Sequence, residues 1–280
     1  MVKIFHISDL HFPTSNWVGS ETSIYNGLHK LMEEEYDEST YFLISGDITF
    51  KGADDGYNEA RRFFTRLMSE LRINRKKIIL CPGNHDIAGH NAFQQFDSFS
   101  NLLREDDIWT FSTKNAIFFE TDDAYFLGIN SSYRKDHKYG SVDLDEVERC
   151  LKSSPMDEEK PRIVIIHHHL LNQYLQDISA IRNVYPFILM LDHFKFHYIF
   201  HGHQHTDQLI PIGNSPIYSC GIRTLGFHTM GVNNSCKMYQ LTKDELTIKH
   251  YSYSSDHPIE GRLGGFKKYN ETKIIRGAYR

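Results

Sequence analysis

The chain has 280 residues, of which 40% are hydrophobic and 24% charged, and its formal net charge is -5. This composition is typical of globular proteins with a substantial core, and the length fits one large domain or two small ones. The negative charge argues against a protein that coats nucleic acid, because such a protein needs a basic face, although a nucleic-acid substrate held by metal ions stays open. The 17 histidines are clustered, which indicates metal or proton chemistry.

Short apolar runs rich in β-branched and aromatic residues predict buried strands along most of the chain. These runs lie at 2–7, 41–45, 77–81, 116–119, 125–129, 163–166 and 198–200. Apolar residues at helical spacing predict helices between the strands. These helices lie at 23–35, 57–71, 143–151 and 181–191. Alternating strands and helices predict an α/β layered domain.

The last third of the chain changes character. Four consecutive strand-like segments, separated by turn residues, are expected to form one antiparallel portion of a sheet. They lie at 208–212, 216–220, 235–241 and 246–253. After residue 254 the chain becomes polar, and we expect loose packing there. The expected organisation is one domain of residues 1–255 followed by a polar C-terminal tail of residues 256–280.

The cysteines and the first residues of the chain indicate the cellular compartment of the protein. None of the four cysteines forms a Cys-x-x-Cys pair, which argues against a zinc knuckle and favours the reduced thiols of a cytoplasmic protein. The opening MVKIFHISDLHF lacks the features of a signal peptide. No apolar run approaches the roughly 20 residues needed to span a bilayer. We therefore expect a soluble cytoplasmic protein with no membrane partner.

Each of five polar segments follows one of the predicted strands. They are Asp9-Leu10-His11, Gly46-Asp47, Gly83-Asn84-His85-Asp86, His167-His168-His169 and His201-Gly202-His203-Gln204-His205. Groups at the carboxyl ends of strands converge on one edge of an α/β sheet, where ligands usually bind. The resulting mixture of carboxylate, amide and imidazole groups suits divalent transition metals such as Mn, Fe or Zn.

Each segment alone also has a plainer interpretation. A lone Asp-x-His is frequent by chance, Gly-Asp and Gly-Asn-His-Asp are turn sequences, and a run of histidines can lie on a surface. All five segments in this order, each directly after a strand, are much harder to produce by accident. The combination therefore favours a metal site.

The ordered set Asp-x-His, Gly-Asp, Gly-Asn-His-Asp, His-His and Gly-His-x-His resembles the signature of the calcineurin-like metallophosphoesterases. The resemblance covers about residues 3–205, and the strands up to about residue 253 fit the closing sheet of that family. It implies an α/β fold in which a β-sandwich of two mixed sheets is flanked by helices, in four layers (αββα). It also implies a pair of bound metal ions (Mn, Fe or Zn) and hydrolysis of phosphoester bonds.

Carried over residue by residue, the resemblance assigns a role to each polar side chain. The first metal would be held by Asp9, His11 and His205, and the second by Asn84, His167 and His203, with Asp47 bridging the two. His85 would face the substrate beside Asn84 and stabilise charge or protonate the leaving oxygen. Asp86 would orient His85.

One departure from the family pattern leaves an assignment open. The family often has Pro shortly after its His-His pair, whereas Leu170 follows a third histidine here. His167 is favoured as the metal ligand because it comes directly after the apolar strand. His168 or His169 would then contact substrate or cap the strand, and we take His168 as the substrate-binding candidate.

Histidines outside these segments receive other interpretations. His6 lies inside the first strand and is expected to be a core residue. Four histidines without companion spacing are expected on the surface, namely His137, His228, His250 and His257. A turn-rich segment at 229–234 is expected to form a loop near the metal edge.

The expected function is metal-dependent hydrolysis of a small-molecule phosphodiester. In length, motif spacing and Gly-Asn-His-Asp form, the chain is similar to the bacterial class III cyclic-nucleotide and glycerophosphodiester phosphodiesterases of the family. One alternative is a metal-dependent nuclease acting on DNA or RNA, since DNA-repair exonucleases of the same family begin with a strand and a motif like Ser8-Asp9-Leu10-His11. Another alternative is a non-catalytic metal-binding scaffold, as in trafficking assemblies, against which His85 and the full ligand set argue.

Overall fold

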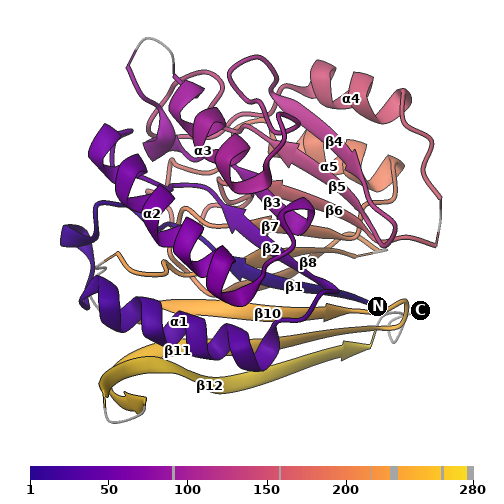
Figure 1. Ribbon diagram of the computed structural model, residues 1–280. Helices are drawn as coiled ribbons and strands as arrows, with labels where there is room; N and C mark the ends of the chain where they lie inside the picture. The colour runs from indigo at the N-terminus through magenta and orange to yellow at the C-terminus, as the bar shows by residue number, and fades with distance from the viewer. Residues whose placement is uncertain (90–91, 158, 215, 228–232, 260–261, 276–280) are drawn as a thin grey trace.

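The computed structural model describes residues 1–275 except 90–91, 158, 215, 228–232 and 260–261. Its strands form two six-stranded sheets with helices against their outer faces (Figure 1). The predicted α/β sandwich of two mixed sheets flanked by helices is therefore confirmed. In the described part of the chain, none of the helices has the length and hydropathy that a bilayer crossing requires.

The first sheet has the strand order β12-β11-β10-β1-β2-β3. Its strands are β1 (Val2–Ile7), β2 (Thr40–Ser45), β3 (Ile78–Cys81), β10 (Ser235–Leu241), β11 (Glu245–Ile259) and β12 (Arg262–Ile275). β1, β2 and β3 run parallel, whereas β10, β11 and β12 continue the sheet antiparallel from β1. The helices on this side are α1 (Glu21–Glu35), α2 (Asp54–Leu71) and α3 (Gln94–Arg104) (Figure 1).

The second sheet has the strand order β4-β5-β6-β7-β9-β8. Its strands are β4 (Ala116–Glu120), β5 (Tyr125–Ile129), β6 (Arg162–Ile166), β7 (Tyr198–His201), β8 (Gln208–Ile212) and β9 (Ile217–Gly221). The four inner strands are parallel, and β4 and β8 pair antiparallel at the two edges. The helices on this side are α4 (Leu144–Lys152) and α5 (Val184–His193). Short 3-10 helices cover Thr14–Asn16, Arg75–Lys77 and Asn84–Asp86.

Strand β6 illustrates why the central strands have continuous apolar sequences. Ile163 and Ile165 belong to the core cluster that the two sheets share, whereas Val164 and Ile166 pack in a second cluster with residues of α4 and α5. A parallel strand covered on both faces needs apolar side chains in both directions. Because neighbouring strands run parallel, their carboxyl ends lie at one edge of each sheet, and the polar segments follow there.

The C-terminal segment differs from the expected loose tail. Residues 262–275 form β12, which pairs antiparallel with β11 and lies beside α1 (Figure 1). Gly27 of α1 and Gly265 of β12 permit this approach, because a Cβ on Gly27 would lie 2.9 Å from the Cα of Gly265. The segment has a polar sequence because β12 is the edge strand of its sheet, so many of its side chains reach water. The expectation of loose packing is wrong for these residues.

The late strands also do not form one antiparallel portion of a sheet. β8 and β9 complete the second sheet, whereas β10, β11 and β12 complete the first. The chain crosses from one sheet to the other between β9 and β10. Turn and strand signals cannot show this crossover, because both halves carry the same local pattern.

A buried charged cluster joins these late strands to the segment that precedes β8. Lys237 of β10 is 1% exposed and donates to the carbonyl oxygen of Gly221 (2.7 Å) and to the Asp207 carboxylate. His250 of β11 lies 3.2 Å from the same carboxylate, to which the Tyr269 hydroxyl also donates. Although burial opposes ionisation, His250 and Lys237 hold the pKa of Asp207 well below its usual value.

Two of the histidine predictions can be compared with this structure. His250 is 7% exposed and paired, so its expected surface position is wrong. His6 is fully buried and lies 2.7 Å from the Ser45 hydroxyl, which confirms a core position. His228, the side chain of His257 and most of the segment 229–234 lie outside the described residues.

Candidate metal centre

The polar segments converge where β1, β2, β3, β6 and β7 end. Asp9 donates its backbone N–H to the carbonyl oxygen of Gly46 (3.1 Å), and His11 donates to that of Asp47 (3.0 Å). The backbone N–H of Gly202 likewise donates to the carbonyl oxygen of His167 (3.1 Å). These bonds continue the strand pairing beyond the sheet and hold the segments side by side.

Most candidate ligands have a left-handed backbone, which is rare for residues other than glycine. Positive φ angles occur at Asp9 (52°), His11 (48°), Asp47 (52°), His203 (70°) and His205 (50°). Each such residue costs on the order of 1 kcal/mol and persists only where the surroundings enforce it. This sharp turn of the chain after each strand directs the side chains toward a common point.

Glycine permits the closest approaches between the segments. A Cβ on Gly202 would overlap the Asp9 carboxylate, and a Cβ on Gly83 would overlap the Asp47 carboxylate. Glycine at these two positions therefore lets the backbone segments pass close to the site.

Asp9, His11 and His205 form the first group of candidate donors. His205 Nε2 lies 3.2 Å from Asp9 Oδ1, and His11 Nε2 lies 4.0 Å from the same oxygen. His11 Nε2 also lies 3.7 Å from Asp47 Oδ2, so Asp47 adjoins this group.

Asp47, His167 and His203 form the second group. His167 Nε2 lies 3.2 Å from Asp47 Oδ2, 3.1 Å from Asn84 Oδ1 and 3.2 Å from His203 Nδ1. His203 Nδ1 lies 3.0 Å from Asn84 Oδ1. Four donor atoms thus face one another, and a further candidate group of His11, Asp47 and His85 links them to the first group.

This arrangement fits cations better than it fits the side chains alone. Both ring nitrogens of His11 are buried and have no hydrogen-bond partner among the described residues. His167 Nδ1 lies 2.8 Å from the carbonyl oxygen of Ser45, so in the neutral ring the proton belongs on Nδ1 and the lone pair of Nε2 faces the group. Asn84 Oδ1 and an imidazole lone pair at such short distance repel each other unless a proton or cation lies between them.

Charge points to the same conclusion. Burial alone would favour the neutral acid of Asp9, yet His205 lowers the pKa of Asp9 to about 2. Burial likewise opposes ionisation of Asp47, but His167 and His11 hold its pKa well below the usual value. Burial lowers the pKa of His167, and the Asp47 carboxylate raises it to about 9. Two buried carboxylates therefore stay ionised and attract positive charge.

The sequence model of one protein family, described as calcineurin-like phosphoesterase, matches residues 2–207 of this chain. The chain belongs to the calcineurin-like phosphoesterase family. The sequence resemblance is thereby confirmed at the level of the family. A search of curated proteins gave no match.

Solved structures share the fold of this phosphoesterase. A purple acid phosphatase, PPD1 from yellow lupin (Lupinus luteus) seeds, superposes with a TM-score of 0.62 at 12% identity, over 99% of this chain and 54% of the other. A putative 5'-nucleotidase from Staphylococcus aureus gives a TM-score of 0.51 at 13% identity, over 98% of this chain and 54% of the other. The chain thus spans about half the length of each, and these likenesses show the fold alone.

The Gly-Asn-His-Asp turn places Asp86 differently from the prediction. The backbone N–H of His85 donates to Asp47 Oδ1 (2.8 Å), and its ring lies 4.8 Å from the His11 ring. Asp86 accepts hydrogen bonds from the backbone N–H groups of Ile48, Thr49 and Gly83 and from the Tyr57 hydroxyl. In the described part of the chain it makes none to the His85 ring. Asp86 therefore holds the Asp47 loop against the turn, and the predicted contact with His85 is wrong.

The histidine triplet separates into three environments. His168 is fully buried, with Nδ1 2.7 Å from the Ser131 hydroxyl, and its ring packs 4.3 Å from the His203 ring. This position argues against the predicted contact of His168 with substrate. His169 Nε2 lies 2.8 Å from Asp177 Oδ2. Of the three, only His167 belongs to a donor group formed by the described residues, as the sequence favoured.

His137 and two phenylalanines adjoin the centre without a sequence signal. Asn84 Nδ2 donates to the His137 carbonyl oxygen (3.2 Å), and His137 Nδ1 lies 3.1 Å from the Asn84 carbonyl oxygen. Asn84 is thus held from its far side by His137, which is exposed as expected. The rings of Phe50 and Phe227 lie beside His11. Pairings of segments so distant in sequence could not be predicted from local spacing.

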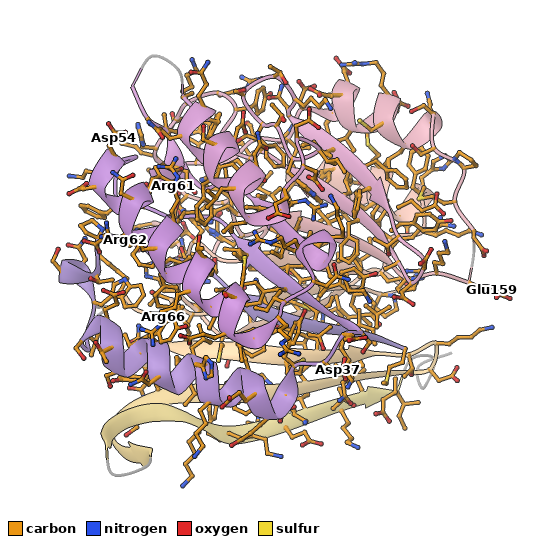
Figure 2. The ribbon with its side chains drawn as sticks, viewed as in Figure 1. Asp37, Asp54, Arg61, Arg62, Arg66 and Glu159 are labelled. Atoms are coloured by element: carbon orange, nitrogen blue, oxygen red, sulfur yellow. The ribbon has the colours of Figure 1, made fainter. Side chains whose placement is uncertain are left out.

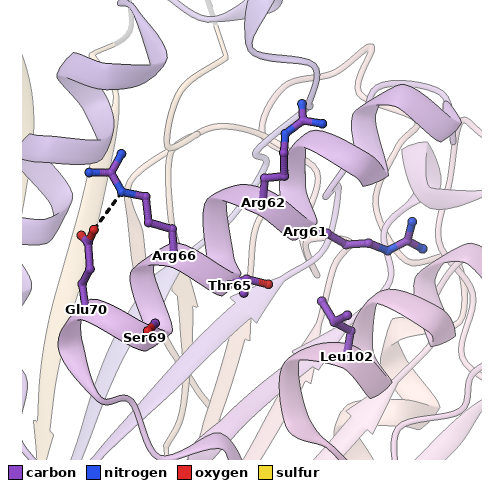
Figure 3. A pocket seen from close by; sticks show the side chains of 7 residues that line it. All are labelled: Arg61, Arg62, Thr65, Arg66, Ser69, Glu70 and Leu102. Atoms are coloured by element: carbon purple, nitrogen blue, oxygen red, sulfur yellow. Dashed lines mark hydrogen bonds and ion pairs between the residues drawn. The ribbon is translucent and has the colours of Figure 1, made fainter.

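A groove of about 550 Å³ lies elsewhere on the phosphoesterase, between α2 and α3 (Figure 3). It is lined by Arg61, Arg62, Thr65, Arg66, Ser69, Glu70 and Leu102. Figure 2 shows its three arginines along α2, where Arg66 Nε donates to Glu70 Oε1 (2.9 Å). No candidate metal ligand lines this groove, so it is separate from the site described above.

Proposed function

We propose that this protein hydrolyses small-molecule phosphodiesters with two bound divalent cations. The observation that carries the proposal is the pair of neighbouring donor groups, with Asp47 in one group and 3.7 Å from His11 of the other. Asp9, His11 and His205 would hold one cation, and Asn84, His167 and His203 the other. The donors are nitrogen and oxygen atoms, which supports Mn, Fe or Zn.

When bound, such a pair of cations supplies a water of lowered pKa and stabilises the charge on the phosphoryl oxygens. The protein side chains would do the rest. His85 would face the departing ester oxygen and supply a proton or a hydrogen bond. Burial lowers the pKa of His85, so its charged form would be favoured only beside a negatively charged phosphoester. General-acid help of this kind is worth about 10²–10⁴-fold in rate.

The preference for a diester over a monoester is supported by the apolar rings beside His85. Phe50 and Phe227 are only half-buried and lie at the edge of the donor groups. A diester carries a second organic group and less negative charge than a monoester, so it suits an apolar neighbour better. The four free thiols, three of them buried, support a cytoplasmic location.

A substrate panel with added Mn²⁺ tests the proposal. The panel contains bis(p-nitrophenyl) phosphate, p-nitrophenyl phosphate, cyclic AMP, glycerophosphocholine and linear DNA. We expect Mn²⁺-dependent hydrolysis of at least one small diester, at a higher kcat/KM than that of the monoester. Cleavage of DNA alone would replace the proposal with a nuclease, and metal binding without any hydrolysis would replace it with a scaffold.

A further inference from the structure

Two phenylalanine rings form an aromatic wall with His85 at one side of the candidate centre. The ring of Phe50 lies 5.3 Å from that of His85 with an interplanar angle of 21°. The ring of Phe227 lies 6.0 Å from that of Phe50 at 18°. Three nearly parallel rings therefore follow one another, and Phe227 also lies 4.5 Å from the ring of His11.

The backbone fixes both phenylalanines relative to the candidate ligands. Phe50 donates its N–H to the carbonyl oxygen of Phe12 (2.8 Å), directly after His11. Phe227 donates its N–H to the Thr224 hydroxyl (3.0 Å), which itself donates to the carbonyl oxygen of Asp9 (2.6 Å). The wall is therefore built on the same segments that present the first donor group.

The exposure of these rings is the unusual feature. Phe12 and Phe63 nearby are buried to 0% and 1% exposure, as core phenylalanines usually are. Phe50, Phe227 and His85 each keep part of their surface open to solvent. Apolar surface beside a cluster of charged groups gains most when a ligand with both an anionic and an apolar part covers it.

We propose that Phe50 and Phe227 form the subsite for one organic group of the substrate and select planar aromatic groups. An aryl ring or a nucleobase would pack on the wall while the phosphoryl group lies at the cations, and this assignment rests on the proposed function. Stacking of a planar group on aromatic side chains is worth roughly three- to tenfold or more in affinity. The exposed Lys51 ammonium lies 5.0 Å from the Phe50 centroid and would move aside or contact the polar edge of the group.

Paired ligands that are not hydrolysed test the subsite separately from catalysis. Isothermal titration of Mn²⁺-loaded protein would compare phenylphosphonate with methylphosphonate, and the phosphonate analogue of AMP with that of ribose 5-phosphate, in which a CH₂ group replaces the ester oxygen. We expect the aromatic member of at least one pair to bind about tenfold more tightly. The first pair reports an aryl preference and the second a nucleobase preference.

Phe50→Leu and Phe227→Leu keep apolar bulk but remove the rings, so they should lower that ratio to about twofold or less while metal content and Tm stay near wild type. Phe50→Tyr keeps a ring and should keep the ratio. Tyr185→Ala removes an aromatic ring that is 72% exposed on α5, away from the wall, and serves as the control.

An unchanged ratio in both leucine variants, or a wild type that prefers neither aromatic member, would overturn the subsite. A lowered ratio in a protein that hydrolyses no diester would keep the subsite and reject the proposed function. Hydrolysis of a diester together with an unchanged affinity ratio in the leucine variants would keep the proposed function and reject the subsite.

Discussion

Two clusters in this molecule balance the charge of carboxylates inside the protein in different ways. In the Lys237 cluster, one carboxylate meets a lysine, a histidine and a tyrosine, so protein groups balance its charge. In the candidate metal centre, Asp9 and Asp47 meet histidines whose nitrogens also face Asn84 and one another. The first cluster is complete in the protein alone, whereas the second needs cations to be satisfied.

The difference teaches how to tell a structural charge from a functional one. Buried charges are expensive unless they are paired, and a structural cluster pairs them internally. A cluster with unpartnered imidazole nitrogens, such as those of His11, and with several left-handed residues retains strain and unmet polar groups. Evolution keeps such an arrangement where a ligand repays the cost. Perturbing each cluster should therefore give opposite results.

The largest effect is expected from removing the Asp47 carboxylate, which lies in one donor group and adjoins the other. Asp47→Asn should reduce activity roughly 10³-fold and lower the bound metal, because the cations lose the group between them. Metal analysis and the kcat/KM for the best substrate measure this. Asp37→Asn, which removes an exposed carboxylate paired with Lys3, is the matched control and should change neither. Wild-type rates in the Asp47 variant would refute the site assignment.

A change in the internally paired cluster should act on stability instead. Lys237→Met leaves the half-buried Asp207 with one charged partner fewer, so the free energy of unfolding should fall, by less than the roughly 3–5 kcal/mol of a fully buried pair. Urea denaturation of metal-free and Mn²⁺-loaded protein measures this. The increase in stability on adding Mn²⁺ should be the same as in wild type. If that increase disappeared, the two clusters would not be independent.

A smaller effect on rate is expected from a residue that touches neither cation. His85→Ala should keep the metal content of wild type and reduce kcat about 10²-fold, because the leaving oxygen loses its proton donor. The loss should be smaller for a substrate with a better leaving group, such as a p-nitrophenyl ester, than for an alkyl ester. Equal losses for both esters would mean that His85 acts without proton donation.

The strand ends and donor residues could be predicted from the sequence, because both are local. A strand is an apolar run, and Asp9, Asn84 or His203 follows such a run directly. The partners of these residues could not be predicted in the same way. Asp86 binds backbone N–H groups of a loop with left-handed residues, and His250 meets a carboxylate that arrives from the other sheet. Such contacts depend on the crossing of segments, which composition and periodicity do not encode.

The same reason explains the C-terminal segment. An edge strand with polar outward residues has nearly the composition of a solvated tail, and only its pairing with β11 distinguishes the two. The glycines that let β12 approach α1 resemble the glycines of a loop when read alone.

The most direct test of the account is the number of cations that the protein binds. Protein freed of metal with a chelator and then dialysed against Mn²⁺ would be analysed by inductively coupled plasma mass spectrometry, with Asp47→Asn alongside. The account predicts about two cations per chain for the wild type and clearly fewer for the variant. A wild type that binds none, or a variant that binds as many as the wild type, would contradict it.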